Sequence, residues 1–119
     1  MASLLYVLTH STEDPDRAVT GLAAAAAALR GGHDVALWLT GEGVRLGVQG
    51  VAETLHEPVP RSAASLLEAL EEGAVPLYLE RSSFERRQYE ESAIRPGAQV
   101  ATAEQLATLL ADGRSAVTL

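Results

Sequence analysis

The sequence predicts an α/β protein, a three-layer α/β/α sandwich around a mainly parallel five-stranded sheet. Short apolar runs alternate along the chain with helical stretches, which is the pattern of parallel strands joined by helical crossovers. The first of these runs, residues 4–8, has no alternation of polar and apolar positions, as expected for a strand that is covered on both faces. A chain of 119 residues without an internal repeat or a flexible linker fits a single domain, residues 1–119.

Five segments have the length and composition of buried strands. The second contains Trp38 among apolar neighbours, and the third has Pro76 near its start, where a missing N–H group is tolerated. The predicted strands are residues 4–8, 35–39, 75–79, 99–101 and 116–119.

The helices between the strands carry start and stop signals. Asp14 suits the N-cap of the first helix, Pro15 suits its first position, and the glycines after Arg30 end it. Thr102 and Gln105 predict a capping box at the start of the last helix. Four further helical segments are predicted between the first and the last helix: a short helix within the glycine-rich residues 41–50, a segment at residues 51–55 broken by the prolines of residues 58–60, a helix over residues 62–72, and a polar, exposed helix over residues 84–92. On the last helix, Leu106, Leu109 and Leu110 are predicted to face inward.

Composition and charge exclude several classes of function. The chain has no cysteine, which removes disulfides, thiolate nucleophiles and iron–sulfur clusters and fits a reducing compartment. Nine arginines and no lysine stand against sixteen acidic residues, and a net charge of −7 argues against a nucleic acid partner. The longest uncharged stretch near the N-terminus, residues 18–29, is shorter than the ~20 residues of a membrane span. With no basic region of a signal peptide either, we expect a cytoplasmic protein with no membrane partner.

Three predicted loops meet at one edge of the sheet. Ligands of open parallel sheets bind beyond the carboxyl ends of the strands, where loop amides and helix N-termini converge. The loops at that edge are residues 9–12, 40–45 and 80–83. The candidate ligand-binding residues are His10, Gly41, Glu42, Gly43, Glu80 and Ser82, and no cofactor is expected.

The glycine loop does not predict a nucleotide site. Gly41, Gly43 and Gly47 have the spacing G-x-G-x-x-x-G, which is one residue off the dinucleotide fingerprint, and they follow the second strand instead of the first. Glu42 would also place a negative charge where a pyrophosphate must approach. The glycines therefore indicate a tight turn under a helix.

Histidines and carboxylates offer one alternative, acid–base chemistry. His10 and Glu80 are its catalytic candidates, with Glu42 as a third member, provided that the three side chains reach a common cavity. The competing interpretation of His10 is a loop residue hydrogen-bonded to backbone. His33 and His56 are interpreted as structural, and three scattered histidines give no metal spacing, so no metal site is expected.

Arginines 81, 86 and 87 are interleaved with glutamates. At helical spacing these residues predict surface ion pairs on a solvated helix face, in preference to an anion site.

The order of these features resembles the DsrE-like family, which includes the sulfur-relay subunits DsrE, DsrF and TusD and the YchN proteins. Three passages carry the resemblance and together span nearly the whole chain: a Thr-His step followed by Asp-Pro and an alanine-rich helix (residues 9–30), Gly-His-Asp-Val leading to Thr-Gly-Glu-Gly-Val-Arg-Leu (residues 32–46), and a helix ending in Glu-Gly before a strand and a polar loop (residues 66–87).

The resemblance implies an architecture but not an inherited activity. Members that carry sulfur use a cysteine in the loop after the third strand, and the matching position here is Glu80, followed by Ser82 and Ser83. Neither a carboxylate nor a hydroxyl holds a persulfide. The resemblance thus implies a cysteine-less homo-oligomer, a trimer or hexamer, that binds a small ligand or a protein partner and is not a sulfur-transferring enzyme. A receiver-like signalling domain is disfavoured, because the chain has no lysine and ends its third strand at Glu80.

Overall fold

The computed structural model describes residues 1–55 and 62–119. The predicted break at residues 58–60 and the structural role predicted for His56 lie outside the described residues. The segment before them forms a single turn of 3₁₀ helix, η2 (Ala52–Thr54), within the predicted helical segment.

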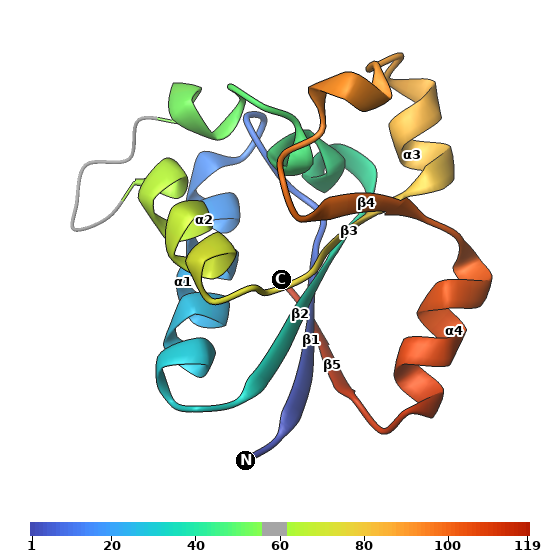
Figure 1. Cartoon of the computed structure of the whole chain (residues 1–119). Coiled ribbons are helices and arrows are strands. Elements are labelled where there is room, and N and C mark those ends of the chain that lie inside the picture. Colours follow the sequence, from blue (N-terminus) through green and yellow to red (C-terminus); the bar gives the residue numbers. More distant parts are fainter. Residues whose placement is uncertain (56–61) are drawn as a thin grey trace.

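The core of the molecule is a five-stranded sheet, and every strand pairing in it is parallel (Figure 1). The predicted α/β sandwich around a mainly parallel sheet is therefore confirmed. The third strand begins two residues later than expected, because Val75 still closes the preceding helix through a hydrogen bond from its N–H group to the Leu70 carbonyl. The order across the sheet is β4-β3-β2-β1-β5, with β1 (Ser3–Leu8), β2 (Asp34–Leu39), β3 (Leu77–Glu80), β4 (Ala98–Ala101) and β5 (Ser115–Thr118).

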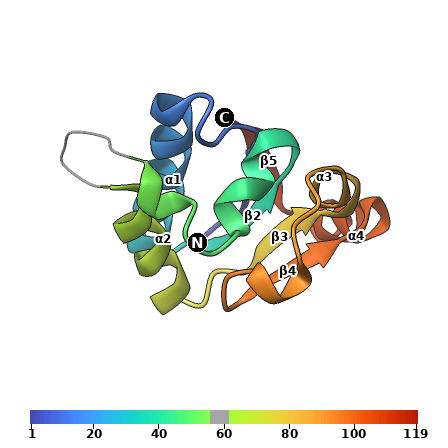
Figure 2. The same ribbon diagram turned by 90° about the horizontal axis from the view of Figure 1, so that it is seen from above.

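Two helices cover one face of the sheet, α1 (Pro15–Arg30) and α2 (Ala63–Glu72) (Figures 1 and 2). The Asp14 carboxylate accepts a hydrogen bond from the Arg17 amide, as predicted for the N-cap. Ala18, Ala25 and Ala26 of α1 are at most 1% exposed, so this helix lies close to its neighbours. The larger hydrophobic core of the molecule lies between these two helices and the sheet.

On the other face, the one helix among the described residues is α4 (Ala103–Ala111), so this face is covered more thinly (Figure 1). The predicted capping box of Thr102 and Gln105 is present. Leu106 and Leu109 pack against a small core that includes Trp38, but Leu110 is 42% exposed. The prediction that Leu110 faces inward is wrong, because no second helix in the described part of the chain lies beside α4 to enclose its outer side.

The polar segment after β3 differs most from the prediction. The helix α3 (Arg81–Arg86) begins three residues earlier than expected and ends before Arg87, and a separate 3₁₀ turn, η3 (Glu91–Ala93), follows it. Phe84 is 4% exposed, so α3 is not wholly solvated; its inner side packs at the carboxyl end of the sheet beside another 3₁₀ helix, η1 (Gly41–Gly47). In Figure 2, which looks down on that end, α3 and η1 lie over the sheet.

A buried arginine ties three segments together on the side of α2. The Arg95 side chain is 8% exposed; its Nε donates to Glu71 Oε1 of α2 at 2.6 Å, and its guanidinium lies 3.4 Å from Glu53 of η2. The Arg95 backbone N–H donates to the Gly47 carbonyl. These contacts fasten the loop before β4 to both the α2 and the η1 side of the molecule.

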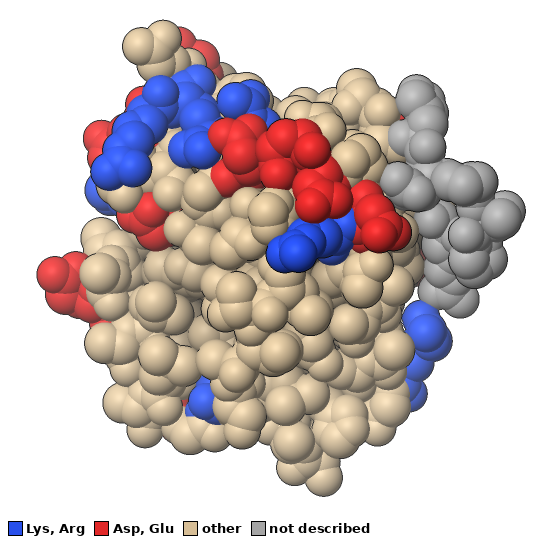
Figure 3. Space-filling view, turned by 180° about the vertical axis from the view of Figure 1, so that it is seen from behind, with Lys and Arg blue, Asp and Glu red and all other residues tan. Residues whose placement is uncertain are grey.

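Charged side chains are distributed unevenly over the surface. Figure 3, which shows the molecule from behind, has a charged upper rim and below it a broad face that is almost free of charge. None of the helices within residues 1–55 and 62–119 is long and apolar enough to cross a membrane.

Candidate functional site

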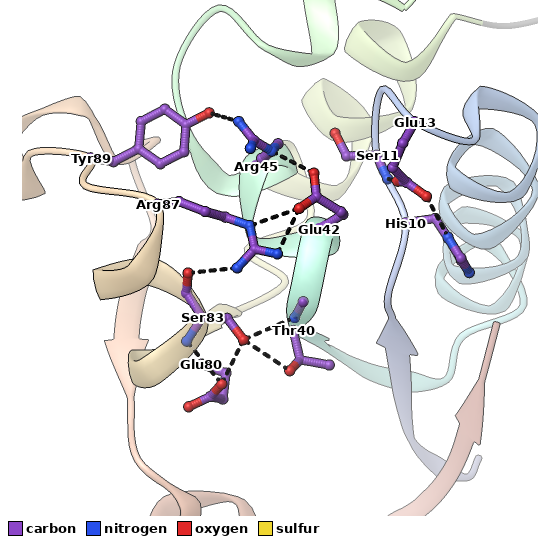
Figure 4. Close-up of polar contacts among 11 residues, drawn as sticks. His10, Ser11, Glu13, Thr40, Glu42, Arg45, Glu80, Ser83, Arg87 and Tyr89 are labelled. Atoms are coloured by element: carbon purple, nitrogen blue, oxygen red, sulfur yellow. Dashed lines mark hydrogen bonds and ion pairs between the residues drawn. The ribbon is translucent and has the colours of Figure 1, made fainter.

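The three candidate loops lie at the carboxyl end of the sheet, because β1, β2 and β3 are parallel and adjacent. Figure 4 shows their polar side chains. The loops after β2 and β3 are joined by hydrogen bonds. In the loop after β1, His10 and the Ser11 amide contact Glu13, and the Thr9 hydroxyl donates to the Leu119 carbonyl.

Glu80 ends β3 and caps α3. Its carboxylate accepts hydrogen bonds from the backbone amides of Ser82 (2.7 Å) and Ser83 (3.1 Å), and from both serine hydroxyls (2.8 and 2.7 Å). Burial raises the pKa of Glu80, but the hydrogen bonds from Ser83 and Ser82 outweigh it and hold the pKa below its ordinary value of 4.5. Glu80 is therefore an ionised helix cap with its acceptor capacity in use.

Ser83 connects this cap to the glycine loop. Its hydroxyl oxygen accepts a hydrogen bond from the Gly41 amide at 3.0 Å and lies 3.4 Å from the Thr40 hydroxyl, while it donates to Glu80. Ser83 is 5% exposed, and the contact holds the start of η1 against the start of α3. Gly41 and Glu80, two of the predicted site residues, are thus bridged by a residue that was not predicted to contact either.

Glu42 lies between two arginines. Its Oε1 accepts from Arg45 Nε at 2.7 Å, and its Oε2 accepts from Arg87 at 2.6 Å and 3.0 Å (Figure 4). The hydrogen bonds from Arg87 and Arg45 lower the pKa of Glu42, and the bond to Glu42 raises the pKa of Arg45. The carboxylate is therefore fixed in its charged form.

The prediction that Arg87 belongs to a solvated helix face is wrong. Its side chain is 19% exposed and pairs with Glu42, 45 positions earlier in the chain, because α3 ends at Arg86 and the next residue turns back over η1. Gln88 then has a φ of 58°, a left-handed conformation that is uncommon for a residue other than glycine.

Tyr89, the residue after this turn, completes the cluster. Its hydroxyl accepts a hydrogen bond from Arg45 at 2.7 Å, and the Arg45 guanidinium carbon lies 5.7 Å from the ring centroid. Arg87 and Tyr89 were missed as site residues. No pattern in the sequence marks them, since their partners lie more than 40 residues away.

Gly43 has a packing role. A Cβ atom at this position would overlap the carbonyl oxygen of Leu8 at the end of β1. The glycine therefore allows η1 to lie directly against the end of β1, in agreement with the prediction of a tight turn.

His10 makes a local contact. Its Nδ1 lies 2.7 Å from Glu13 Oε2, and the other oxygen of Glu13 accepts a hydrogen bond from the Ser11 amide. Among the residues that the structure describes, no hydrogen bond joins His10 to Glu42 or Glu80, and in Figure 4 its ring points away from both. The hydroxyl of the adjacent Ser11 is fully buried and, within the same part of the chain, has no hydrogen-bond partner.

At the carboxyl end of the sheet, the charged side chains after β2 and β3 are held in place by hydrogen bonds. The two carboxylates after β2 and β3 are ionised and held by donors, and the chain contains no thiol. Within residues 1–55 and 62–119, no group of three or more histidine, aspartate or glutamate side chains is placed to hold a metal ion. His33, read as structural, accepts a hydrogen bond on Nδ1 from the Ala2 amide.

Comparison with known proteins gives a family and a fold. The profile of the DsrE/DsrF-like family matches residues 2–119. The structure is similar to that of the YchN protein from E. coli, with a TM-score of 0.82, 20% sequence identity and full coverage of both chains. It is also similar to MTH1491, a protein of unknown function from Methanobacterium thermoautotrophicum, with a TM-score of 0.74, 7% identity and full coverage of both chains. At these identities the two structures show a shared fold. No match is found among the curated proteins.

Proposed function

The chain belongs to the DsrE/DsrF-like family, and on that premise we propose that it acts by binding within a homo-oligomeric assembly and transfers no sulfur through its own side chains. It is a non-catalytic relative of the sulfur-relay subunits, and the assembly is a trimer or a hexamer. Its partner is a small ligand or another protein, which contacts the polar rim at the carboxyl end of the sheet.

The state of Glu80 is the observation that carries this proposal. By resemblance, Glu80 stands where sulfur-carrying relatives have a cysteine. Its carboxylate accepts hydrogen bonds from two amides and two hydroxyls of its own helix. A carboxylate cannot replace a thiolate as a persulfide carrier. With no cysteine elsewhere in the chain, a sulfur acceptor is missing from the polypeptide.

The neighbouring contacts support a binding role for the rim. Glu42 is held by Arg45 and Arg87, and Gly41 is held by Ser83, so the loops after β2 and β3 form a preorganised surface. Preorganised polar groups lose little conformational entropy on binding, which favours recognition. The predicted ligand-binding residues His10, Gly41, Glu42, Gly43, Glu80 and Ser82 are the proposed contact residues.

The acid–base alternative with His10, Glu42 and Glu80 stays a prediction. It needs a shared cavity, and the polar partner of His10 in the structure is Glu13. No observation favours it over the binding role.

A sulfur-loading assay combined with native mass spectrometry tests the proposal. The purified chain is incubated with ³⁵S-labelled polysulfide, desalted and counted, with the Glu80→Cys variant as a matched control that restores a thiol at the same position. We expect no retained label on the natural chain, label on the variant that is released by dithiothreitol, and a native mass that is a multiple of the 12.5 kDa chain. Label retained by the natural chain would overturn the non-carrier role, and a monomeric mass would overturn the assembly role.

A further inference from the structure

We propose that the outer edge of β5 binds the same strand of a second copy of this chain, antiparallel to it, about a two-fold axis at Val117. The two sheets then join into one ten-stranded sheet. This inference rests on the proposed homo-oligomeric role and names the surface that the role requires.

The backbone of β5 is open on one side. The strand lies at the end of the sheet, β1 is its one partner among residues 1–55 and 62–119, and all four of its residues are exposed. The Leu119 N–H group donates to the Val7 carbonyl of β1. Because backbone groups of successive residues in a strand point to opposite sides, the N–H and C=O groups of Ala116 and Thr118 point outward, away from β1.

These outward groups are self-complementary. Antiparallel pairing centred on Val117 places Ala116 of each copy opposite Thr118 of the other. Each such pair exchanges two N–H···O bonds, so the contact satisfies four donors and four acceptors. Val117 then lies opposite Val117 of the second copy in a non-hydrogen-bonded position, where side chains approach most closely.

An exposed apolar side chain, that of Val117, lies on this edge strand. Within residues 1–55 and 62–119, the exposed large hydrophobic side chains are those of Met1, Leu110 and Val117. Val117 is 44% exposed and stands next to Tyr6 in the sheet register, on the face that α1 covers. Leu110, at 42%, lies on α4, on the opposite face. A second copy paired along β5 would bury the exposed Val117 side chain against its counterpart.

Charge also favours this face for a contact between identical chains. A net charge of −7 makes two copies repel in general. The face shown in Figure 3 is almost free of charge below its upper rim, and the strand itself has no charged residue. Arg114, just before β5, is 14% exposed and neutralises Asp34 at 3.2 Å.

Charged side chains line hollows beside both edges of the sheet, but β5 itself carries none. Proteins usually guard an exposed edge strand with charged side chains or proline. At the β4 edge, an open hollow of about 460 Å³ is lined by Arg81, Glu91 and Arg95 together with Pro96. At the β5 edge, Asp16 and Arg17 of α1 line a hollow together with Thr118 and Leu119, and Ser115–Thr118 itself contains no charged residue or proline.

Disulfide trapping tests the contact, since the chain has no cysteine of its own. In the Val117→Cys variant, the two-fold pairing places the introduced thiols on Cα atoms about 4.5 Å apart, within reach of a disulfide. The matched control is Gln99→Cys, an exposed position on the opposite edge strand. At micromolar protein with diamide as oxidant, paired thiols at millimolar effective concentration should form the covalent dimer ~1000-fold faster than the control.

A second variant, Val117→Lys, is measured by native mass spectrometry beside Gln99→Lys. We expect an even number of chains in the natural assembly, half that number in Val117→Lys, and no change in Gln99→Lys. Three outcomes would each overturn the β5 contact and leave the proposed assembly role intact. They are equal trapping rates for the two cysteine variants, a natural assembly with an odd number of chains, and an unchanged mass of the Val117→Lys assembly. A monomeric natural chain would overturn both.

Discussion

Removing the buried guanidinium of Arg95 should destabilise the fold more than any other loss of a single ion pair described above. Arg95→Ala leaves the Glu71 carboxylate without its 2.6 Å donor, and it leaves a gap where the arginine side chain crosses between η2 and α2. The loop before β4 loses its side-chain attachment to the α2 side of the molecule.

The expected cost follows from burial. Arg95 is 8% exposed and Glu71 is 24% exposed, so the pair is partly shielded from water. Breaking a buried ion pair by removing one partner costs about 3–5 kcal/mol, and the residual hydration of Glu71 places this pair at the lower end, about 3 kcal/mol. The contact to Glu53 adds little, because it is 3.4 Å long and Glu53 is 49% exposed.

Urea unfolding followed by circular dichroism measures this loss. With a slope of about 1.5 kcal/mol per molar urea, the unfolding midpoint of Arg95→Ala should fall by about 2 M. The matched control is Glu53→Gln, for which we expect a loss of less than about 1 kcal/mol. A loss below about 1 kcal/mol for Arg95→Ala, or equal losses for the two variants, would refute the reasoning from burial.

Three further predictions concern the carboxyl end of the sheet. Gly43→Ala should lower the free energy of unfolding, measured with urea, by about 3 kcal/mol, at the upper end of the range for overpacked sites. The added methyl group meets the Leu8 backbone, which cannot rotate away as a side chain can. An unchanged free energy of unfolding would contradict the close approach of η1 to β1. Ser83→Ala should lower the free energy of unfolding by about 1–2 kcal/mol, because the Ser83 hydroxyl bridges two loops and the residue is 5% exposed. Ser82→Ala, at an exposed position, should lower it by less than about half of that. A larger loss for Ser82→Ala than for Ser83→Ala would count against the bridge. The pKa values of Glu42 and Glu80 are lowered in the folded state, so their contribution to stability is present above pH 4.5 and is lost as the pH falls through the lower folded values. Urea midpoints measured from about pH 6 down to about pH 3 should therefore fall less in the Glu42→Gln, Glu80→Gln double variant than in the natural chain, and parallel curves would show that these two residues are not the source.

The elements of this fold were predictable because their signals are local. Asp14 and Pro15 start α1, and Thr102 with Gln105 starts α4, since a helix cap depends on residues within one turn. Uninterrupted apolar runs predicted the buried parallel strands. The exposure of Leu110 was not predictable, because the helical spacing of leucines says which side of a helix is apolar but not how many elements will cover it.

The candidate site was predictable only in outline. Parallel strands bring the loops after β1, β2 and β3 to one edge whatever their side chains do, so Glu42 and Glu80 were found by topology alone. Their partners could not be found in this way. Arg87 and Tyr89 reach Glu42 and Arg45 because α3 stops at Arg86 and the chain reverses at Gln88, a conformation that no sequence signal marks.

The amino-acid sequence by itself determined the α/β class, the starts of α1 and α4 and the lack of any thiol, because each depends on composition or on neighbours along the chain. The tertiary structure decided which carboxylates are held in the ionised form, which arginine is buried and which edge of the sheet is left open. These properties depend on contacts between residues far apart in the chain and on water excluded by packing, and a linear pattern contains neither.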